Sequence, residues 1–368
     1  MEGAIALGLM VLITLVMGSL YLLLPRLTRR GLLFGVYVGE EASLGPEAER
    51  LKRRWSRAIV LWMALSLALG GLLAWLVYPA AAVAAPAMVL SLGYLIEYLR
   101  AYRAARPLAR PGPPSAVAAL GGTEAKPNPL PYLALAFGVA AGLFALGFTL
   151  VHLADLPDIV PTHFGPSGRP DAFRPRSFWT VWALPLMTLV LGVGQGAIAV
   201  LTGQAKRALR RSDAGVSLAA QQRFRRTVSN FVAVTGLLAT TLLTLTSVSA
   251  VRVATGQAAG LGPAVMLVGG LLMVVALGGS LLIAVRFGQG GARLEAAAAG
   301  SPLTNGLADN AHWVLGLFYV NREDPSIFVE HRFGFGYTVN FGNPKAVALL
   351  AIFLLLVLGL AFGSALFG

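Results

Sequence analysis

Apolar residues in this chain gather into long blocks that follow neither the helical period of 3.6 residues nor the strand period of two. About 20 helical residues, rising 1.5 Å each, cross the roughly 30 Å of hydrocarbon in a membrane. Eight blocks have about this length: 3–24, 57–77, 80–99, 132–153, 178–201, 229–251, 263–285 and 344–367. Backbone in lipid must satisfy its hydrogen bonds internally, and no block alternates as a barrel strand does. The pattern predicts an all-α integral membrane protein with about eight transmembrane helices.

Composition points the same way, because only 12% of the 368 residues are charged and 57% are hydrophobic. A soluble domain carries about 25% charged residues. The first block lacks both a basic amino-terminal region and an A-x-A-like cleavage site, so we expect a retained helix rather than a signal peptide. The sequence has no cysteine, which excludes disulfides, thiolate metal sites and cysteine nucleophiles.

The positive charges are distributed unevenly among the connections between blocks. If the amino terminus is outside, 25 of the 29 Lys and Arg residues fall in cytoplasmic connections. This asymmetry follows the positive-inside rule, so we expect both termini outside and a bacterial plasma membrane as the location. The net charge of +13 is then explained by anionic lipid headgroups beside basic runs such as 50–57 and 206–226, and we expect no direct contact with nucleic acid.

The blocks and connections suggest five regions. These are an N-terminal three-helix membrane region (1–130), a helix–loop–helix region with an unusual outer loop (131–201), two further helices with a basic cytoplasmic loop (202–285), a cytoplasmic β-like segment (286–343) and a last membrane helix (344–368). Within the first region, the run ARPLARPGPPS is rich in proline and glycine and predicts a flexible linker.

Few polar side chains are placed deep in the predicted spans. Glu97 and His152 lie near span ends, where they can reach headgroup water. Gln195, between Gly194 and Gly196, is the deepest strongly polar side chain, and an amide in such a setting commonly bonds to a neighbouring helix. The absence of ionisable groups near span centres disfavours an ion-coupled pump.

The connection between the fourth and fifth spans, HLADLPDIVPTHFGPSGRPDAFRPRSFW, concentrates proline, glycine, aspartate and histidine. Its prolines fix φ at several points and its glycines permit tight reversals, so we expect a loop of one defined shape. Rigid loops hold side chains for recognition. The candidate ligand-binding or loop-locking residues are His163, Asp171, Asp158, Phe164, Gly168 and Pro170.

This run resembles the signature L-P-x-x-I-P-x-H-[FW]-x-x-x-G-x-P-D of a bacterial membrane domain of unknown function, found in the immunity protein for the sporulation-delaying toxin. The matching positions are Leu156, Pro157, Pro161, His163, Phe164, Gly168, Pro170 and Asp171, with Val160 in place of isoleucine and Pro185 in the following helix. The resemblance implies that some relatives protect a cell from a secreted antimicrobial peptide, and that one signalling branch retains a transcriptional repressor at the membrane.

Three chemical roles remain open for the outer loop. His163 can bond Asp171 and lock the loop, or His163, Asp171 and His152, with Asp155 and Asp158 nearby, can hold zinc or a similar ion. No cofactor is required by the first role. A hydrolase would use His163 as base and Ser167 or Ser177 as nucleophile, but no nucleophile-elbow pattern accompanies them.

The segment before the last span alternates like strands, with Asp324-Pro325 and Gly334 to Gly336 at the reversals, and predicts a small cytoplasmic β-hairpin element. It resembles G-x-x-Y-x-N-x-x-D-P-x-x-F-V-x-x-R-x-G-x-G-[WY]-T-x-N-F-[GA]-N-P, a second domain of unknown function that often accompanies the first. The matching positions are Gly316, Tyr319, Asn321, Asp324, Pro325, Phe328, Val329, Arg332, Gly334, Gly336, Tyr337, Thr338, Asn340, Phe341, Asn343 and Pro344.

These observations favour a membrane binding protein that acts in peptide-toxin immunity or membrane signalling. Its partners would be the lipid bilayer, a peptide or envelope ligand outside and a regulator in the cytoplasm. A transporter or exporter is the alternative, and a membrane metallohydrolase is a third interpretation.

Overall fold

A computed structural model describes residues 2–76, 79–111, 118–119, 128–165, 167–204, 207–208, 214–288, 291, 293–294, 310–334 and 336–367. The chain forms two compact units. The first comprises Met1–Ala125, Ala205–Arg225 and Ser280–Ala346, and the second comprises Lys126–Gln204, Arg226–Gly279 and Val347–Gly368. Of the run ARPLARPGPPS (105–115), residues 105–111 are described and contain a short turn, whereas 112–115 lie outside the described residues, as do Lys206, Arg210 and Arg211 of the basic run.

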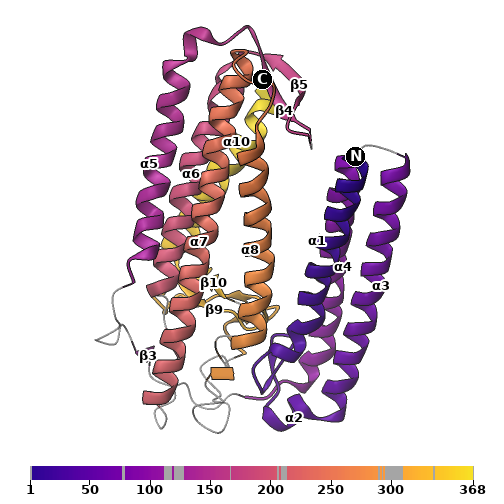
Figure 1. The fold of residues 1–368 in the computed structure, drawn as a ribbon. Coiled ribbons are helices and arrows are strands. Elements are labelled where there is room, and N and C mark those ends of the chain that lie inside the picture. Colours follow the sequence, from indigo (N-terminus) through magenta and orange to yellow (C-terminus); the bar gives the residue numbers. More distant parts are fainter. Residues whose placement is uncertain are drawn as a thin grey trace. The chain divides into compact units, whose positions relative to one another are not determined.

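Three helices of the first unit run side by side: α1 (Glu2–Leu27), α3 (Pro46–Leu76) and α4 (Pro79–Ala105) (Figure 1). The short helix α2 (Glu40–Leu44) precedes α3, and the turn η1 (Arg106–Leu108) follows α4. Proline is favoured in the first turn of a helix, where its missing N–H has no intrahelical acceptor, and both α3 and α4 begin with one. Arg50, Arg53, Arg54 and Arg57 are exposed on one face of the first turns of α3.

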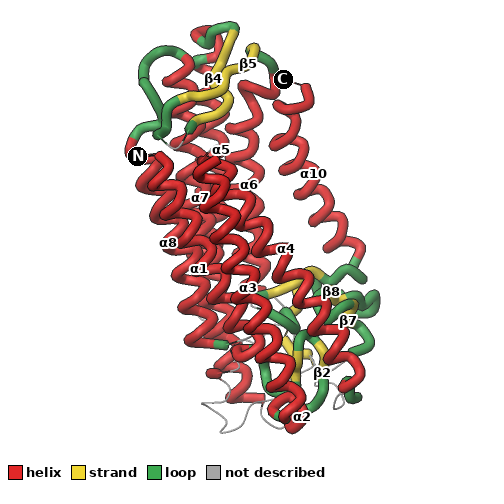
Figure 2. The backbone as a smooth tube through the Cα atoms, turned by 90° about the vertical axis from the view of Figure 1, so that its right-hand side faces the viewer, coloured by secondary structure: helices red, strands yellow, loops and turns green. Residues whose placement is uncertain are grey.

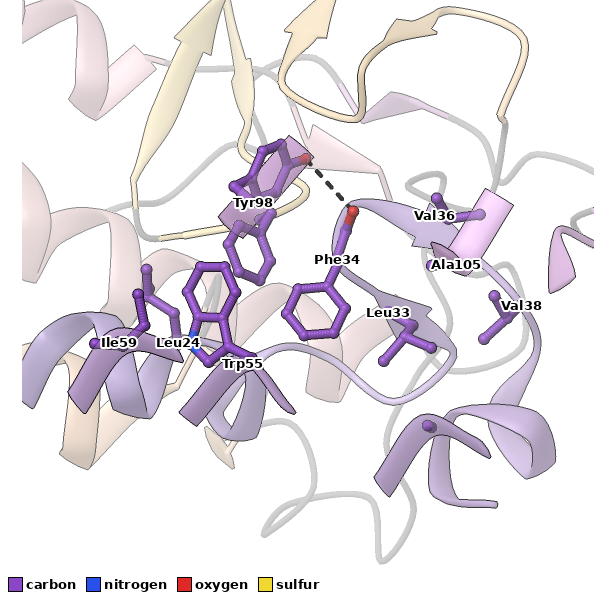
Figure 3. Close-up of a cluster of buried hydrophobic side chains, with 11 residues drawn as sticks. Leu24, Leu33, Phe34, Val36, Val38, Trp55, Ile59, Tyr98 and Ala105 are labelled. Carbon is purple, nitrogen blue, oxygen red and sulfur yellow. Dashed lines mark hydrogen bonds between the residues drawn. The ribbon is translucent and has the colours of Figure 1, made fainter. Parts of the chain in front are cut away.

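The strands β1 (Leu32–Leu33) and β2 (Val36–Tyr37) form a hairpin with two residues in its turn. Phe34 and Gly35 both have positive φ, 45° and 78°, as a type I′ turn requires. The Phe34 ring enters a buried aromatic cluster with Trp55 and Tyr98 (Figure 3), joined by Phe333 from the segment before the last helix. This cluster is the core of the first unit.

Two further hairpins follow the last described turn of α8. They are formed by β7 (Trp313–Val314) with β8 (Phe318–Tyr319), and by β9 (Phe328–Glu330) with β10 (Tyr337–Val339). A bridge between Tyr319 and Asn340 connects them. A β-hairpin element before the last helix is thus confirmed, and β7 is a strand that the sequence pattern did not predict. The short pair β3 (Ala118–Ala119) and β6 (Arg207–Ala208) completes the strands of this unit.

Connections that the charge pattern places on one side of the membrane meet in the first unit. The Asn310 side chain accepts a bond from the Tyr37 amide at 3.0 Å and donates to the carbonyl of Arg110 at 3.2 Å. These residues follow α8, α1 and α4 respectively. The three connections therefore lie at a common end of their helices.

The second unit contains α5 (Leu130–Val151), α6 (Phe178–Gln204) and parts of α7 (Ala214–Ala254), α8 (Pro263–Phe287) and α10 (Pro344–Phe367). Glycines bring α5 and α6 into close contact. A Cβ at Gly138 would lie 2.5 Å from the backbone of Gly192, and one at Gly142 would lie 2.5 Å from Leu189. Larger residues would therefore separate these two helices.

Seven described helices are long and apolar enough to cross a membrane. They are α1, α3, α5, α6, α7, α8 and α10; the predicted span 80–99 lies in α4, which packs against α1 and α3 and is not among the seven. With only two-stranded sheets beside these helices, the predicted class of all-α multi-pass membrane protein is confirmed.

Candidate ligand site beneath the β4–β5 hairpin

The connection between α5 and α6 folds into an antiparallel hairpin of β4 (Ile159–Phe164) and β5 (Pro170–Pro175), after the turn η2 (Leu153–Asp155). Figure 2 shows this hairpin at the same end of the unit as the last turns of α10. The sequence predicted a fixed loop but no strands here. Proline cannot donate to a sheet ladder, yet it is tolerated because each strand of an isolated pair has an open edge.

His163 and Asp171 face each other across the two strands. Nδ1 of His163 lies 2.5 Å from Oδ1 of Asp171, and the register of the pair shifts on both sides of His163. Both side chains are more than half exposed. The predicted loop-locking pair is therefore in contact, and the irregular register is where this pair bridges the strands.

Backbone contacts hold the tip of the hairpin. Gly165 N–H donates to Arg169 and Gly168 N–H donates to Gly165, at 2.9 and 2.8 Å. Gly168 has φ of 75°, which favours glycine. Its carbonyl accepts a bond from the amide of Leu261 in the α7–α8 connection at 2.9 Å. The two connections of the second unit thus meet at the tip.

Arg176 fixes the base of the hairpin, a role that the sequence analysis missed. Its guanidinium donates to the carbonyl of Leu156 at 2.8 Å, and its amide donates to the carbonyl of Asp158 at 2.7 Å. A search for arginines next to the strand-ending prolines could have suggested it. The Asp158 side chain is exposed, and this candidate residue serves the fold through its backbone.

A cavity of about 440 Å³ lies beneath the hairpin within the second unit. Strand β4 contributes Val160, Pro161, Thr162, His163 and Phe164. The remaining walls come from α5, α6, α7 and α10, with Leu156 and Leu261 from the two connections. Pockets that hold small molecules have volumes of about 300 to 1,000 Å³ and mostly apolar walls. The signature residues of the connection therefore line a cavity of ligand size, which the sequence alone could not show.

Residues with hydroxyl groups on three helices line the same cavity. They belong to Thr149 of α5, Thr180 of α6, and Thr246 and Ser247 of α7. Pro185 of α6 also lines it, and proline has no amide hydrogen to give the carbonyl of Val181 one turn earlier. The walls thus combine apolar surface with a few polar atoms.

The remaining candidate residues are placed differently. Nδ1 of His152 bonds the carbonyl of Phe148 at 2.9 Å, and its ring stacks on the Phe148 ring. Within the described residues, no group of three or more His, Asp or Glu side chains is close enough to hold a metal ion. Pro170 begins β5, opposite Phe164, and contributes to the hairpin rather than to the cavity wall.

Ser177, one nucleophile of the hydrolase interpretation, caps α6. The Ser177 amide donates to the Thr180 hydroxyl oxygen at 2.8 Å, and the Thr180 amide donates to the Ser177 hydroxyl oxygen at 3.3 Å. This reciprocal arrangement satisfies backbone donors at a helix start. The contacts of Ser177 are those of a structural residue.

The second motif, in the β7–β10 element, forms a hydrogen-bond network. The side-chain amide of Asn340 donates to the backbone carbonyls of Asn321 and Asp324, both at 2.9 Å. The Tyr319 hydroxyl donates to the Asp324 carboxylate at 3.1 Å. Asn343 donates to the carbonyl of Pro325 at 2.9 Å. The motif residues therefore hold the two hairpins together.

Buried charge completes this element. Arg332 is 1% exposed, donates to Asn310 at 2.8 Å and lies over the Trp313 ring. Gly334 and Gly336, with φ of 107° and 90°, form the reversal that follows it. The contacts of the second motif are those of a structural element, whereas residues of the first motif, His163 among them, line the cavity.

Two family models match this chain. A domain of unknown function (DUF1648) matches residues 141–189, and a family of unknown function (DUF5808) matches residues 322–347. The first segment spans the β4–β5 hairpin and the adjoining ends of α5 and α6, and the second spans β9, β10 and the start of α10. No curated protein and no solved structure matches the chain significantly.

Proposed function

We propose that this integral membrane protein binds an apolar or amphipathic peptide at the cavity beneath the β4–β5 hairpin, and that this binding serves immunity or signalling at a bacterial plasma membrane. The observation that carries the proposal is the cavity itself. It has ligand size, and its roof is made by the residues that resemble the immunity-protein signature.

The position of the cavity suits a ligand that arrives through or along the membrane. Its walls include Leu184, Met187 and Leu360 from helices that are apolar enough to span a bilayer. The positive-inside rule places the hairpin outside, where a secreted peptide would arrive. A regulator in the cytoplasm would meet the opposite ends of the helices.

The test uses a strain that lacks the gene, challenged with membrane-active peptides and with secretions of neighbouring bacteria. Wild-type protein should restore growth. His163→Ala and Asp171→Ala should each lose this protection at unchanged membrane abundance, and the double variant should be no worse, because residues that act as a unit are non-additive. Asp158→Ala is the control, since its exposed carboxylate lies just before β4.

Full protection by both single variants would refute the proposed site. The amount of bound zinc distinguishes the loop-locking role of His163 and Asp171 from a metal-binding role. If zinc joins His163 and Asp171, each alanine variant should lower the zinc content of purified protein; a direct bond predicts no such change. The 2.5 Å separation of the two side chains favours the direct bond.

A transporter is the second candidate, because polar side chains follow the α6–α7 contact. Thr188 and Ser247 hydroxyls lie 3.3 Å apart, Ser229 donates to the Ala199 carbonyl at 2.8 Å, and a Cβ at Gly236 would lie 3.1 Å from Oε1 of Gln195. If a substrate passes along these polar side chains of α6 and α7, Gln195→Leu should abolish its flux into liposomes. Unchanged protection by the same variant would favour binding alone.

A further inference from the structure

The hydroxyl groups that the helices contribute to the cavity lining already donate their hydrogens within the protein. Thr149 donates to the Ala145 carbonyl at 2.9 Å, and Thr246 donates to the Leu242 carbonyl at 2.8 Å. Thr180 has carbonyls of Pro175 and Ser177 within 3.2 Å. A hydroxyl has one hydrogen and two lone pairs, so the oxygens of Thr149 and Thr246 can offer only acceptor capacity to a ligand. The Thr180 oxygen already accepts the Ser177 amide.

The hydroxyl hydrogen of Ser247 is also committed, because it is donated to Thr188. Thr188 donates to the Leu184 carbonyl at 2.9 Å, and its oxygen lies 3.3 Å from the Ser247 hydroxyl. Since the Thr188 hydrogen is taken, Ser247 must be the donor between them. The lone pairs of the Ser247 oxygen add further acceptors to the cavity wall.

Two other groups add acceptors. When the His163 imidazole is neutral, Nδ1–H donates to Asp171 and Nε2 keeps a lone pair. The Val181 carbonyl lacks a helical donor at Pro185, as described above. The side chains of Thr162 and Trp179 also line the cavity, and the Trp179 ring packs against Gly363.

The net charge of the α5–α6 connection does not favour a cationic or an anionic ligand. The connection from 152 to 177 carries three arginines and three aspartates. The selection of a ligand depends on the direction of the hydrogen bonds in the cavity walls, because these walls mainly offer acceptors. Burying a polar group without a partner costs roughly 1 to 3 kcal/mol, so an acceptor-only ligand would be disfavoured in this cavity.

We infer that the cavity selects an amphiphile whose polar end donates hydrogen bonds, with a primary ammonium group on an apolar chain as the best fit. This rests on the proposed ligand role of the cavity. A lysine side chain or a free amino terminus on an apolar peptide supplies the same chemistry.

The experiment uses the full chain in phosphatidylcholine nanodiscs and four probes with one alkyl chain. They end in a primary ammonium, a trimethylammonium, a hydroxyl or a carboxylate. The primary and quaternary ammonium probes carry the same charge, and only the first can donate hydrogen bonds. Binding is followed by quenching of Trp179 with chain-brominated probes, taken as the difference from Trp179→Phe.

The primary ammonium probe should bind about tenfold more tightly than the trimethylammonium probe, as expected for hydrogen bonds to a charged group. Thr246→Val keeps the side-chain shape and should weaken ammonium binding about fivefold without changing trimethylammonium binding. Thr241→Val is the matched control, because Thr241 makes the same backbone bond on α7, at 2.8 Å, and does not line the cavity.

Equal affinity for the two ammonium probes, or equal effects of the two threonine variants, would overturn the inference and leave the ligand site intact. Failure of all four probes to quench Trp179 would overturn the proposed ligand site itself.

Discussion

The hydroxyl of Tyr98 donates a hydrogen bond of 2.8 Å to the carbonyl of Leu315 and so joins α4 to the β7–β8 turn. Tyr98 is fully buried, and its oxygen also lies 3.4 Å from the Phe34 carbonyl, in the turn of the other hairpin. The two turns touch: a Cβ on Gly35 would lie 2.9 Å from the carbonyl oxygen of Gly316. One phenol therefore serves both hairpin turns.

Tyr98→Phe should destabilise the first unit by about 1 to 3 kcal/mol, because the carbonyls of Leu315 and Phe34 both lose their donor and the Phe34 carbonyl is buried. Amide exchange should rise in β7 and β8, and the melting temperature of the purified protein should fall. Tyr102→Phe is the control, since its ring stacks on Tyr98 but, among the described residues, its hydroxyl makes no hydrogen bond to either turn. Equal losses in both variants would show that ring packing, not the hydrogen bond, matters.

Leu315 and Phe34 allow a matched test of backbone strain. Both adopt left-handed φ, 53° and 45°, but Leu315 is 40% exposed whereas Phe34 is 1% exposed. Leu315→Gly should stabilise the protein by up to about 1 kcal/mol, because glycine adopts this conformation without steric cost.

Phe34→Gly should instead cost about 3 to 5 kcal/mol, since the buried ring is lost. Thermal unfolding in detergent measures both. A loss of stability in Leu315→Gly would mean that contacts of the Leu315 side chain stabilise the fold by more than its left-handed backbone conformation costs.

The sequence predicted the membrane helices well because their length and apolar character are local properties. It missed β4 and β5, whose prolines argue against strands in a larger sheet, and it missed β7. It paired His163 with Asp171 because both lie on one short connection. It could not predict Thr246, Ser247 or Leu360 as neighbours of that pair, because helix packing far along the chain brings them together.

His331 should make the β9–β10 hairpin sensitive to acid. Burial lowers the pKa of this imidazole, against a smaller opposite effect of the Phe333 backbone, so the folded protein disfavours its charged form. The unfolded chain binds a proton near the ordinary pKa of about 6.5. Stability from this residue is therefore complete above that pH and falls as the pH drops below it.

Amide exchange in β9 and β10, compared at neutral and mildly acidic pH, measures this effect. His331→Gln should remove most of the pH dependence, and His312→Gln in the same element should keep it. A pH dependence that survives His331→Gln would assign the effect to another group.

The absence of cysteine makes the chain suited to a topology test by single cysteines. The sequence predicts that 25 of the 29 basic residues face the cytoplasm, so Ser167→Cys and Gln257→Cys should react with an impermeant maleimide in whole cells. Glu41→Cys and Glu323→Cys should react only after the membrane is opened. All four positions are exposed. The reverse labelling pattern would refute the proposed orientation.

α5, the β4–β5 hairpin and α6 form a single structural piece made from one continuous stretch of chain. The two helices are adjacent in sequence and pack closely on each other through Gly138 and Gly142, and the hairpin between them is held by its own contacts at the base. Such a hairpin can insert into a membrane before the rest of the chain is made. The matched segment 141–189 lies wholly within it, so the family model covers a part of the chain that is continuous both in sequence and in space.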